Sequence, residues 1–431
     1  MNQTFSVSYR GQIHRAAKNH DLTGTARSTS ADEIFARIRP YLERIRVTRI
    51  AEMTGMDRTG IPVFIALRPD ARIPSLTFGK GMSREQARVS ACMECLERYH
   101  GEVVDLPRFR RSHAELLGQP DREFDVIPFE QLLPCKNSFF HPGLALEWTL
   151  GWDIVNQREV AVPWEQVTLT PFLPPNALGA FIGGSNGLAA GGIFLEALAQ
   201  ALLEVIERDA LTCHFLAAKA MGSPTMLHRV REDSIPFDPV RELLATIRLA
   251  GLEPLLHDCT VDTDVPVFEC TIIDPEQPNA GLAKGFGASL DPAVAMLRAV
   301  TESALGRLEV LSGMRDNFPP HEFASVRMLA DETLIRKMLD QPAQVDAADY
   351  RSAAGQTFEA DVEILVSRLA GVGLERVVVF DITQPDMPVS IVRVVVPGLE
   401  GYHEFSYSRP GPRARTFART LCRDRDHPCP Y

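Results

Sequence analysis

The sequence predicts a mixed α/β (α+β) fold in which sheets are flanked by helices, and three observations predict it. Short β-type runs lie near both ends of the 431-residue chain, at 46–52 and 62–67 and again at 376–383 and 389–396. Segments of helical periodicity lie between these runs. Glycine-containing segments also recur ahead of acidic helices. The length leaves room for two or three packed subdomains.

The terminal elements have clear local signals. Ser30 can cap a helix, Asp32 and Glu33 place negative charge in its first turn, and apolar residues recur at positions 34, 38, 41 and 45. Residues 362–370 form a second amphipathic helix candidate. Residues 385–388 contain two prolines and predict a turn, so the runs on either side of them predict a hairpin.

The middle of the chain is less regular. Residues 109–175 contain all three tryptophans and predict an irregular connection with short strands such as 145–153. Residues 309–360 predict a polar helical insertion with a helix around 324–339. We divide the chain into an N-terminal arm and helix (1–58), a main domain (59–405) and an Arg- and Pro-containing tail (406–431) that we expect to be mobile.

Composition excludes several classes of protein. Apolar residues make up 45% of the chain, and 45 Lys and Arg against 56 Asp and Glu give a net charge of −11. This balance disfavours nucleic-acid binding by bulk charge. The sequence predicts neither a membrane span nor a secretory signal, and eight cysteines are too sparse for a disulfide scaffold. We therefore expect a cytoplasmic protein with no nucleic-acid or membrane partner.

Two segments repeat one plan, in which a glycine precedes a helix that carries a Glu-x-x-Glu-Arg motif. The glutamates follow the glycine at offsets of 13 and 16 in both segments, from Gly81 to Glu94 and Glu97 and from Gly191 to Glu204 and Glu207. A third, looser segment leads from residues 285–287 to Arg298 and Glu302. We interpret this as an internal duplication of part of a site.

The repeated residues suit a metal-bound nucleotide. Glutamates three residues apart share a helix face, and their mutual repulsion favours a bound cation such as Mg²⁺, for which carboxylates are suitable ligands. Glycine turns ahead of helices offer N–H groups to anions. Four basic side chains could bind phosphate oxygens: Lys80, Arg98, Arg208 and Arg298.

The alternative without a functional role is a solvated helix face with local ion pairs, which is the usual structural context of a single Glu-x-x-Glu-Arg motif. Here the neighbouring positions are apolar, so both helices are expected to be buried. Buried carboxylates need partners. Cys92 and Cys95 have zinc-like spacing, but we expect them in the core because no second pair lies nearby. A sulfur relay through Cys422 and Cys429 is a further hypothesis.

At this point the sequence resembles the YcaO superfamily, in motifs that run in family order from about residue 60 to 405. The first group is Gly79-Lys-Gly81 with Ser90-x-x-x-Glu94-x-x-Glu97-Arg98. The second is Ser185-Asn-Gly-Leu-Ala-Ala-Gly191 with Glu196 and Glu204-x-x-Glu207-Arg208. The others are Gly285-x-Gly-Ala-x-Leu-Asp291-Pro292 with Arg298-x-x-x-Glu302, and Val396-Pro-Gly-Leu-Glu400. One departure is Gly192, where members of the family often have Asn.

The resemblance implies a fold particular to this family, with ATP and several Mg²⁺ ions bound between acidic helices. It implies that the metal ligands are Glu94, Glu97, Glu204, Glu207 and Glu302. It implies nucleotide contacts from Ser90, Glu196, Arg208 and Arg298, to which we add Lys80, Glu94 and Arg98. We expect Glu207, Arg208 and Arg298 to be catalytic. A basic residue near the N-terminus often reaches the phosphates in this family, and the candidates are Lys18 and Arg27.

YcaO-like enzymes activate a peptide backbone amide by phosphorylating its oxygen. The motif Thr54-Gly-Met-Asp57-Arg58-x-Gly60-Ile-Pro62 is similar to that of members associated with TfuA-type partner proteins. We therefore favour formation of a thioamide in a peptide or protein substrate, with a TfuA-like partner. The alternatives are azoline formation by a cyclodehydratase, a noncatalytic accessory factor and a metal-binding structural protein. We expect a homodimer.

Overall fold

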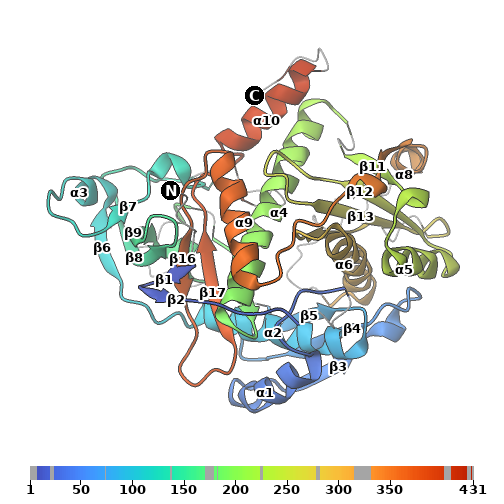
Figure 1. The fold of residues 1–431 in the computed structure, drawn as a ribbon, viewed down its shortest axis with the longest axis horizontal. Helices are drawn as coiled ribbons and strands as arrows, with labels where there is room; N and C mark the ends of the chain where they lie inside the picture. The colour runs from blue at the N-terminus through green and yellow to red at the C-terminus, as the bar shows by residue number, and fades with distance from the viewer. Residues whose placement is uncertain are drawn as a thin grey trace. The chain divides into compact units, whose positions relative to one another are not determined.

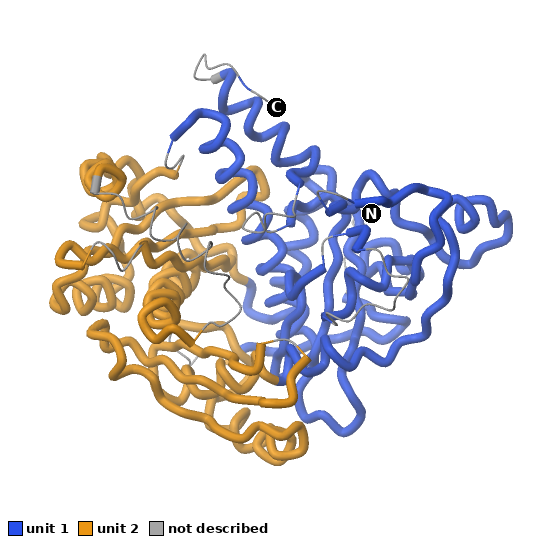
Figure 2. The backbone as a smooth tube through the Cα atoms, turned by 180° about the vertical axis from the view of Figure 1, so that it is seen from behind, with its two compact units in different colours: residues 1–18, 96–226, 355–431 blue, residues 19–95, 227–354 orange. Residues whose placement is uncertain are grey.

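The computed structural model describes residues 7–19, 24–72, 74–135, 138–169, 179–181, 183–223, 227–277, 282–314, 332–401, 409–424 and 429. The chain forms two compact units (Figure 2). Unit 1 comprises residues 1–18, 96–226 and 355–431, and unit 2 comprises residues 19–95 and 227–354. The boundary at residue 95 falls within helix α2 (Arg84–Glu102). Our three-part division of the chain stays a prediction.

Unit 1 is built on a seven-stranded sheet with the order β10-β17-β16-β8-β9-β7, in which β6 also pairs with β8. Its strands are β6 (Phe109–Ser112), β7 (Asp125–Val126), β8 (Ala145–Asp153), β9 (Arg158–Pro163), β10 (Leu188–Gly191), β16 (Val378–Asp381) and β17 (Ser390–Val395). The predicted strand at 145–153 and the predicted hairpin near the C-terminus are both confirmed.

Helix α4 (Phe194–Ala220) packs against β10 and β17 of this sheet (Figure 1). Its residues are apolar on most sides, and most of its side chains are buried, which is typical of a helix in the core. Helices α9 (Phe358–Gly371) and α10 (Pro412–Asp424) pack on α4 in turn. Short elements complete unit 1: β1 (Ser8–Tyr9), β2 (Gln12–Ile13) and α3 (His113–Leu117).

Unit 2 contains a five-stranded sheet, β14-β13-β12-β11-β15, and a three-stranded sheet, β3-β4-β5. The strands are β3 (Arg49–Glu52), β4 (Val63–Leu67), β5 (Leu76–Lys80), β11 (His228–Arg231), β12 (Glu253–Asp258), β13 (Val267–Ile273), β14 (Ala283–Ala288) and β15 (Ala343–Asp346). Helices α5 (Asp238–Leu249) and α6 (Pro292–Ser312) cover the larger sheet, and their apolar faces form its core.

The N-terminal helix of unit 2 agrees with the sequence. Helix α1 (Ala31–Arg44) is capped by the Ser30 hydroxyl, which accepts a hydrogen bond from the Glu33 N–H. The prediction of a helical insertion at 309–360 is wrong in part, because β15 lies within it and pairs with β11. Helix α8 (Glu332–Leu339) covers the end of the predicted helix, and residues 324–331 lie outside the described residues.

The repeated glycines lie in or directly after strands, not in the turns that we expected. An added Cβ at Gly191, the last residue of β10, would lie 2.4 Å from the Ala197 backbone nitrogen. At Gly81, directly after β5, it would lie 2.8 Å from the Ala87 backbone nitrogen. Both partners are six residues after their glycine and lie in the first turns of α4 and α2. The glycines therefore allow a strand to touch a helix backbone, as glycine in a strand often does.

This contact explains the shared spacing of the glutamates. Ala87 precedes Glu94 by seven residues, and Ala197 precedes Glu204 by the same number, which is about two helical turns. The first glutamate of each pair therefore lies at the same distance along its helix from the strand contact. β14 and α6 make a similar close contact between a strand and a helix backbone, although with a different spacing. An added Cβ at Gly285 would lie 1.9 Å from the Ser303 nitrogen.

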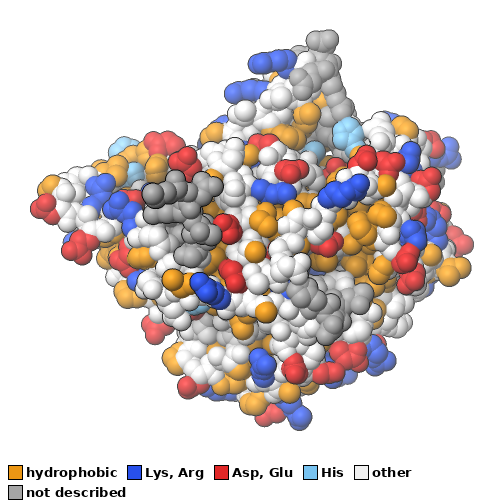
Figure 3. Space-filling view, in the orientation of Figure 1, with side chains coloured by type: hydrophobic (Ala, Val, Ile, Leu, Met, Phe, Trp, Pro, Cys, Tyr) orange, Lys and Arg blue, Asp and Glu red, His pale blue; other side chains and the backbone are white. Residues whose placement is uncertain are grey.

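The prediction of a mobile C-terminal tail is wrong for residues 412–424, which form helix α10. Its buried residues are Ala414, Ala418 and Cys422, which recur every four residues and pack inward. The exposed residues include Arg415, Arg419 and Arg423, and basic side chains gather over this helix in Figure 3. Cys422 is buried, which contradicts the exposure that a sulfur relay in a mobile tail would need.

Two buried carboxylates join α10 to α4. The Glu400 carboxylate accepts hydrogen bonds from the N–H groups of Gly411 (2.7 Å) and Ala414 (2.8 Å) at the start of α10. Asp209 on α4 accepts hydrogen bonds from the Glu400 N–H (2.9 Å) and from Nε of Arg413 (2.8 and 3.0 Å). Burial raises the pKa of Asp209 to about 6, although Arg413 opposes the shift.

Substitution of Gly191 with alanine should destabilise unit 1 by about 3 kcal/mol or more, because the new Cβ overlaps the backbone of α4. Gly371→Ala is the matched control, since an added Cβ at Gly371 meets nothing within 4 Å. Urea denaturation followed by circular dichroism measures both free energies of unfolding. Equal stability of the two variants would contradict the role of Gly191 in close packing.

Substitution of Arg413 with alanine should cost about 2–4 kcal/mol, because it leaves the fully buried Asp209 without its cation. The control is Arg423→Ala, which removes an exposed arginine from the same helix and should cost less than about 1 kcal/mol. Limited proteolysis should also cut the Arg413→Ala protein faster near residue 409. Similar effects of the two substitutions would show that Arg413 does not hold α10 in place.

Candidate functional site

Helix α4 carries the second acidic pair in a buried setting. Glu204 and Glu207 lie one turn apart on the same helix face, and Glu207 is only 4% exposed. Arg208 Nη2 lies 3.8 Å from Glu207 Oε1. Glu196, which is 3% exposed, lies in the first turn of the same helix. Glu196 and Glu207 are buried, and Glu204 is half-buried, so α4 does not present a fully solvated acidic face.

Glu97, at the C-terminal end of α2, is tied to the strand that leads into α4. Its Oε2 accepts a hydrogen bond from the Ala190 N–H at 3.1 Å, and Ala190 lies in β10. One glutamate of the first acidic pair is thus fixed within unit 1, which also contains the second pair.

Arg393 is a functional candidate that the sequence analysis missed. It lies on β17, is 4% exposed and donates a hydrogen bond from Nη1 to the Gly184 carbonyl oxygen at 2.6 Å. Burial lowers the pKa of Arg393 to about 10, while the carboxylates of Glu204 and Glu97 oppose the shift. A single arginine within the run Ile391-Val-Arg-Val-Val395 is the signal that could have revealed it.

Unit 2 contains the other predicted residues. Lys80, at the end of β5, forms an ion pair with Glu302 on α6, with 2.6 Å between Nζ and Oε2. Glu94 accepts a hydrogen bond from the Phe78 N–H at 3.1 Å. Arg298 lies one turn before Glu302 on α6. Lys80 therefore pairs with a predicted metal ligand, and its role as a phosphate contact stays a prediction.

Ser90 and Arg98 lie on the same helix as the first acidic pair, and both side chains are half-buried. The structure brings Glu97 and Glu204 near a shared cation and places Glu94, Lys80 and Glu302 within unit 2. Their assignment as metal ligands and nucleotide contacts stays a prediction.

The donor set fits a hard cation. The predicted ligands are all carboxylates, which are oxygen donors of the kind that Mg²⁺ prefers. Burial raises the pKa of Cys92 to about 12, so its thiol stays neutral and is a poor metal ligand. Within the described parts of the chain, no three His, Cys, Asp or Glu side chains are grouped as a preformed metal site.

The loop before β10 leaves a buried polar atom available to a ligand. Oδ1 of Asn186 is buried and has no hydrogen-bond partner among the described residues, which is uncommon for a buried amide. The segment ahead of this loop is held by Glu165, which accepts hydrogen bonds from the N–H groups of Ala180 and Phe181. Burial raises the pKa of Glu165 to about 7.

The N-terminal basic candidates make contacts within the protein. Lys18 Nζ lies 2.5 Å from Asp361 Oδ2 and donates to the Gly355 carbonyl oxygen at 2.7 Å. These contacts place Lys18 at the start of α9 in this structure. Arg27 forms a main-chain bridge with Asn19. The choice between the two candidates as phosphate contacts stays a prediction.

Two residues of the motif that resembles TfuA-associated members have a structural role in unit 2. Asp57 accepts hydrogen bonds from Nε of Arg307 at 3.1 Å, and Arg58 pairs with Asp274 at 2.9 Å. Arg307 also pairs with Asp274 at 2.9 Å, and the side chains of these two residues are buried. The motif therefore anchors the start of β4 to α6, the helix that carries Arg298 and Glu302.

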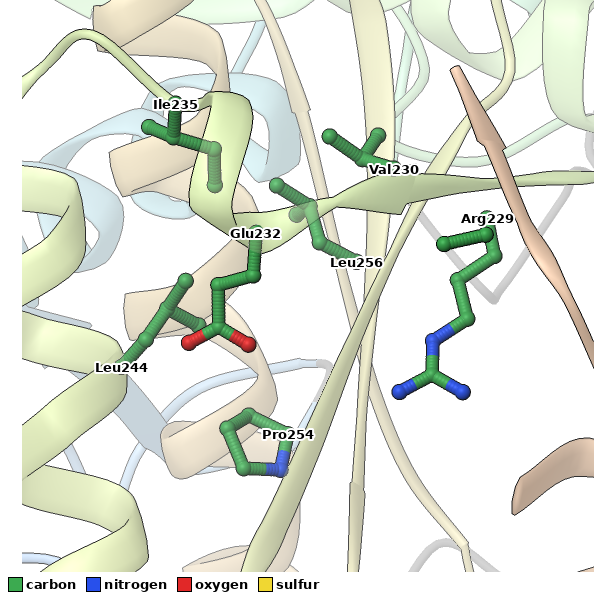
Figure 4. A pocket seen from close by; sticks show the side chains of 8 residues that line it. Arg229, Val230, Glu232, Ile235, Leu244, Pro254 and Leu256 are labelled. Carbon is green, nitrogen blue, oxygen red and sulfur yellow. The ribbon is translucent and has the colours of Figure 1, made fainter. Parts of the chain in front are cut away.

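A small cavity of about 60 Å³ lies elsewhere in unit 2 (Figure 4). Arg229, Glu232 and Leu244 are among the residues that line it. Arg248 binds the Glu232 carboxylate, and Arg229 donates to the Leu339 carbonyl oxygen at 3.0 Å. None of the predicted site residues lines this cavity, so it is not our candidate site.

No helix in the described part of the chain is both long and apolar enough to cross a membrane.

Comparison with known proteins identifies the family. The model for "YcaO cyclodehydratase, ATP- and Mg²⁺-binding" matches residues 78–400. A relative from Rhizobium leguminosarum bv. trifolii, described as an uncharacterized protein in the tfuA 3′ region, is 30% identical over 398 residues, which cover 90% of this chain and 92% of the relative.

Two solved structures share the fold. A heterocyclase in complex with substrate and cofactor matches 95% of this chain and 56% of its own, with a TM-score of 0.76 and 23% identity. YcaO from Methanopyrus kandleri bound with AMPPCP and Mg²⁺ matches 89% of this chain and 95% of its own, with a TM-score of 0.69 and 27% identity. From the extent of these matches and the order of its acidic motifs, this chain belongs to the YcaO family, which is described as binding ATP and Mg²⁺.

Proposed function

We propose that this protein is an ATP- and Mg²⁺-dependent enzyme that installs a thioamide in a peptide or protein backbone. The observation that carries the proposal is the acidic face of α4, where buried Glu207 lies beside half-buried Glu204 and Arg208 within the matched family domain. Such a face has little structural value in an apolar core unless it binds cations.

The chemistry converts an amide oxygen into a leaving group. Sulfide adds to the carbonyl carbon of the amide, the oxygen takes a phosphoryl group, and the C–O bond breaks to release phosphate as the C=S bond forms. When bound, ATP supplies the phosphoryl group and Mg²⁺ offsets the negative charge of the phosphate oxygens. The protein needs no covalent nucleophile of its own.

The residues of this chain divide into three roles in the proposal. The carboxylates of Glu94, Glu97, Glu204, Glu207 and Glu302 would hold the metal ions. Arg208 and Arg298 would neutralise charge as the phosphoryl group moves, since guanidinium groups can contact phosphate oxygens in pairs. Ser90, Glu196, Lys80 and Arg98 would position the nucleotide.

Two features favour thioamide formation. The relative encoded beside tfuA aligns over nine-tenths of this chain. The motif at residues 54–62, which contains Asp57 and Arg58, also resembles that of TfuA-associated members. We propose a TfuA-like protein as the partner. We also propose a homodimer and, because free thiols suit a reducing compartment, a cytoplasmic location.

The second candidate is azoline formation on Cys, Ser or Thr of a precursor peptide, which the description of the family model as a cyclodehydratase favours. The two reactions share the phosphorylated amide and differ in the nucleophile. Mass spectrometry separates them, because exchange of oxygen for sulfur raises the peptide mass and loss of water lowers it.

Substitution of Glu207 with glutamine should lower ATP turnover by about 100-fold or more, because it removes a charge from the proposed metal site while keeping the side-chain volume. Phosphate release in the presence of Mg²⁺, sulfide and candidate peptides measures turnover. Calorimetry with AMPPCP and Mg²⁺ measures nucleotide binding without turnover.

Glu242→Gln is the matched control, since Glu242 is exposed on α5, and this variant should keep full turnover. Full turnover by Glu207→Gln would contradict the assignment of α4 as the metal face. Tight AMPPCP binding by the wild-type protein, together with no ATP hydrolysis when partner and peptide are present, would instead identify a noncatalytic accessory factor.

A further inference from the structure

We propose that Arg393 is the protein's own counter-cation for Glu97 and Glu204, and that it offsets the repulsion between these two carboxylates before Mg²⁺ binds. The inference rests on the proposed function in one respect, namely that Glu97 and Glu204 are metal ligands. It adds a residue on β17, a strand that contains none of the acidic motifs.

The sheet register places Arg393 beside the acidic residues. Leu188 of β10 pairs with Arg393 of β17, and Ala190, two residues further along β10, donates its N–H to Glu97 at 3.1 Å. β17 and β10 both pack against α4, which carries Glu204 (Figure 1). Three elements that are distant in sequence thus bring one guanidinium close enough to two carboxylates for both to raise the pKa of Arg393 against the effect of burial.

The hydrogen bonding of Arg393 leaves part of its guanidinium uncommitted. Nη1 is used by the Gly184 carbonyl oxygen at 2.6 Å, whereas Nε is buried and has no hydrogen-bond partner among the described residues. A purely structural arginine in a core is normally fully hydrogen-bonded. Nε therefore stays available to one more acceptor in this part of unit 1.

Charge balance explains why a cation is needed here. Glu97, Glu204 and Glu207 would place three negative charges in a setting where Arg208 supplies one positive charge. Like charges that share a site of low polarity repel each other strongly. Arg393 lowers this repulsion, so the carboxylates can stay close together before Mg²⁺ binds.

The test compares the response of three proteins to Mg²⁺ alone. Thermal unfolding is followed over a range of Mg²⁺ concentrations for wild type, Arg393→Met and Arg393→Lys, without nucleotide. Without metal, Arg393→Met should unfold at a lower temperature than wild type. Mg²⁺ should raise its unfolding temperature by more than it raises that of wild type, because its apparent Mg²⁺ affinity should be about tenfold higher or more. Arg393→Lys keeps the charge and should respond like wild type.

A merely structural role predicts a different result. If Arg393 only fills space and bonds Gly184, Arg393→Met should lose stability equally with and without Mg²⁺. An equal loss, or a smaller Mg²⁺ response than in wild type, overturns the inference. If Arg393→Met does not fold, the double variant Arg393→Met/Glu204→Gln decides the question, because removal of one anion together with the cation should restore folding. Failure of the double variant to fold as well overturns the inference.

The outcome is separable from that of the proposed function. Loss of the Mg²⁺ response in both wild type and Arg393→Met contradicts metal binding itself and overturns the inference with it. A heightened response in Arg393→Met supports the inference even if Glu207→Gln keeps full turnover, in which case the proposed function alone fails.

Discussion

The burial of carboxylates on an otherwise apolar helix is the constraint on which the rest of unit 1 depends. Helix α4 fills the space between the seven-stranded sheet and the helices α9 and α10, and it has few positions that water can reach. It nevertheless contains Glu196, Glu207 and Asp209 as buried anions. Each anion has to be balanced by a nearby cation or by N–H groups, since an isolated charge in a core is very unfavourable. Arg208, Arg393 and Arg413 are the basic side chains that the structure places near this helix.

Much of the fold could be predicted because its signals are local. The capped helix near residue 30, the strand at 145–153 and the hairpin of β16 and β17 follow from periodicity and turn residues within one segment. The duplicated acidic motif and the family could also be predicted, because the spacing of 13 and 16 residues can be read from the sequence. The glycines were located correctly and explained wrongly, because only the structure shows that they face helix backbones.

The features that were missed depend on contacts between distant segments. Nothing near Arg393 in sequence indicates that it donates a hydrogen bond to a loop carbonyl and interacts electrostatically with two glutamates from other elements. Helix α10 was mistaken for a mobile tail because its four arginines dominate its composition, whereas the small residues of its buried face pack inward, where the helix contacts α4. The ion pair of Lys18 with Asp361 likewise spans most of the chain. Ion pairs between residues that are far apart in sequence leave no local sequence pattern from which they could be predicted.

The junction between Glu400 and α10 has a consequence for where the domain ends. The match to the family model ends at residue 400. The carboxylate of that residue accepts hydrogen bonds from the N–H groups of residues 411 and 414, and the nearby Asp209 accepts one from Arg413. A gene shortened to the conserved region would encode two interior anions whose compensating groups had been deleted. We therefore expect the smallest stable version of this polypeptide to extend beyond residue 400, because helix α10 supplies groups that compensate these two anions.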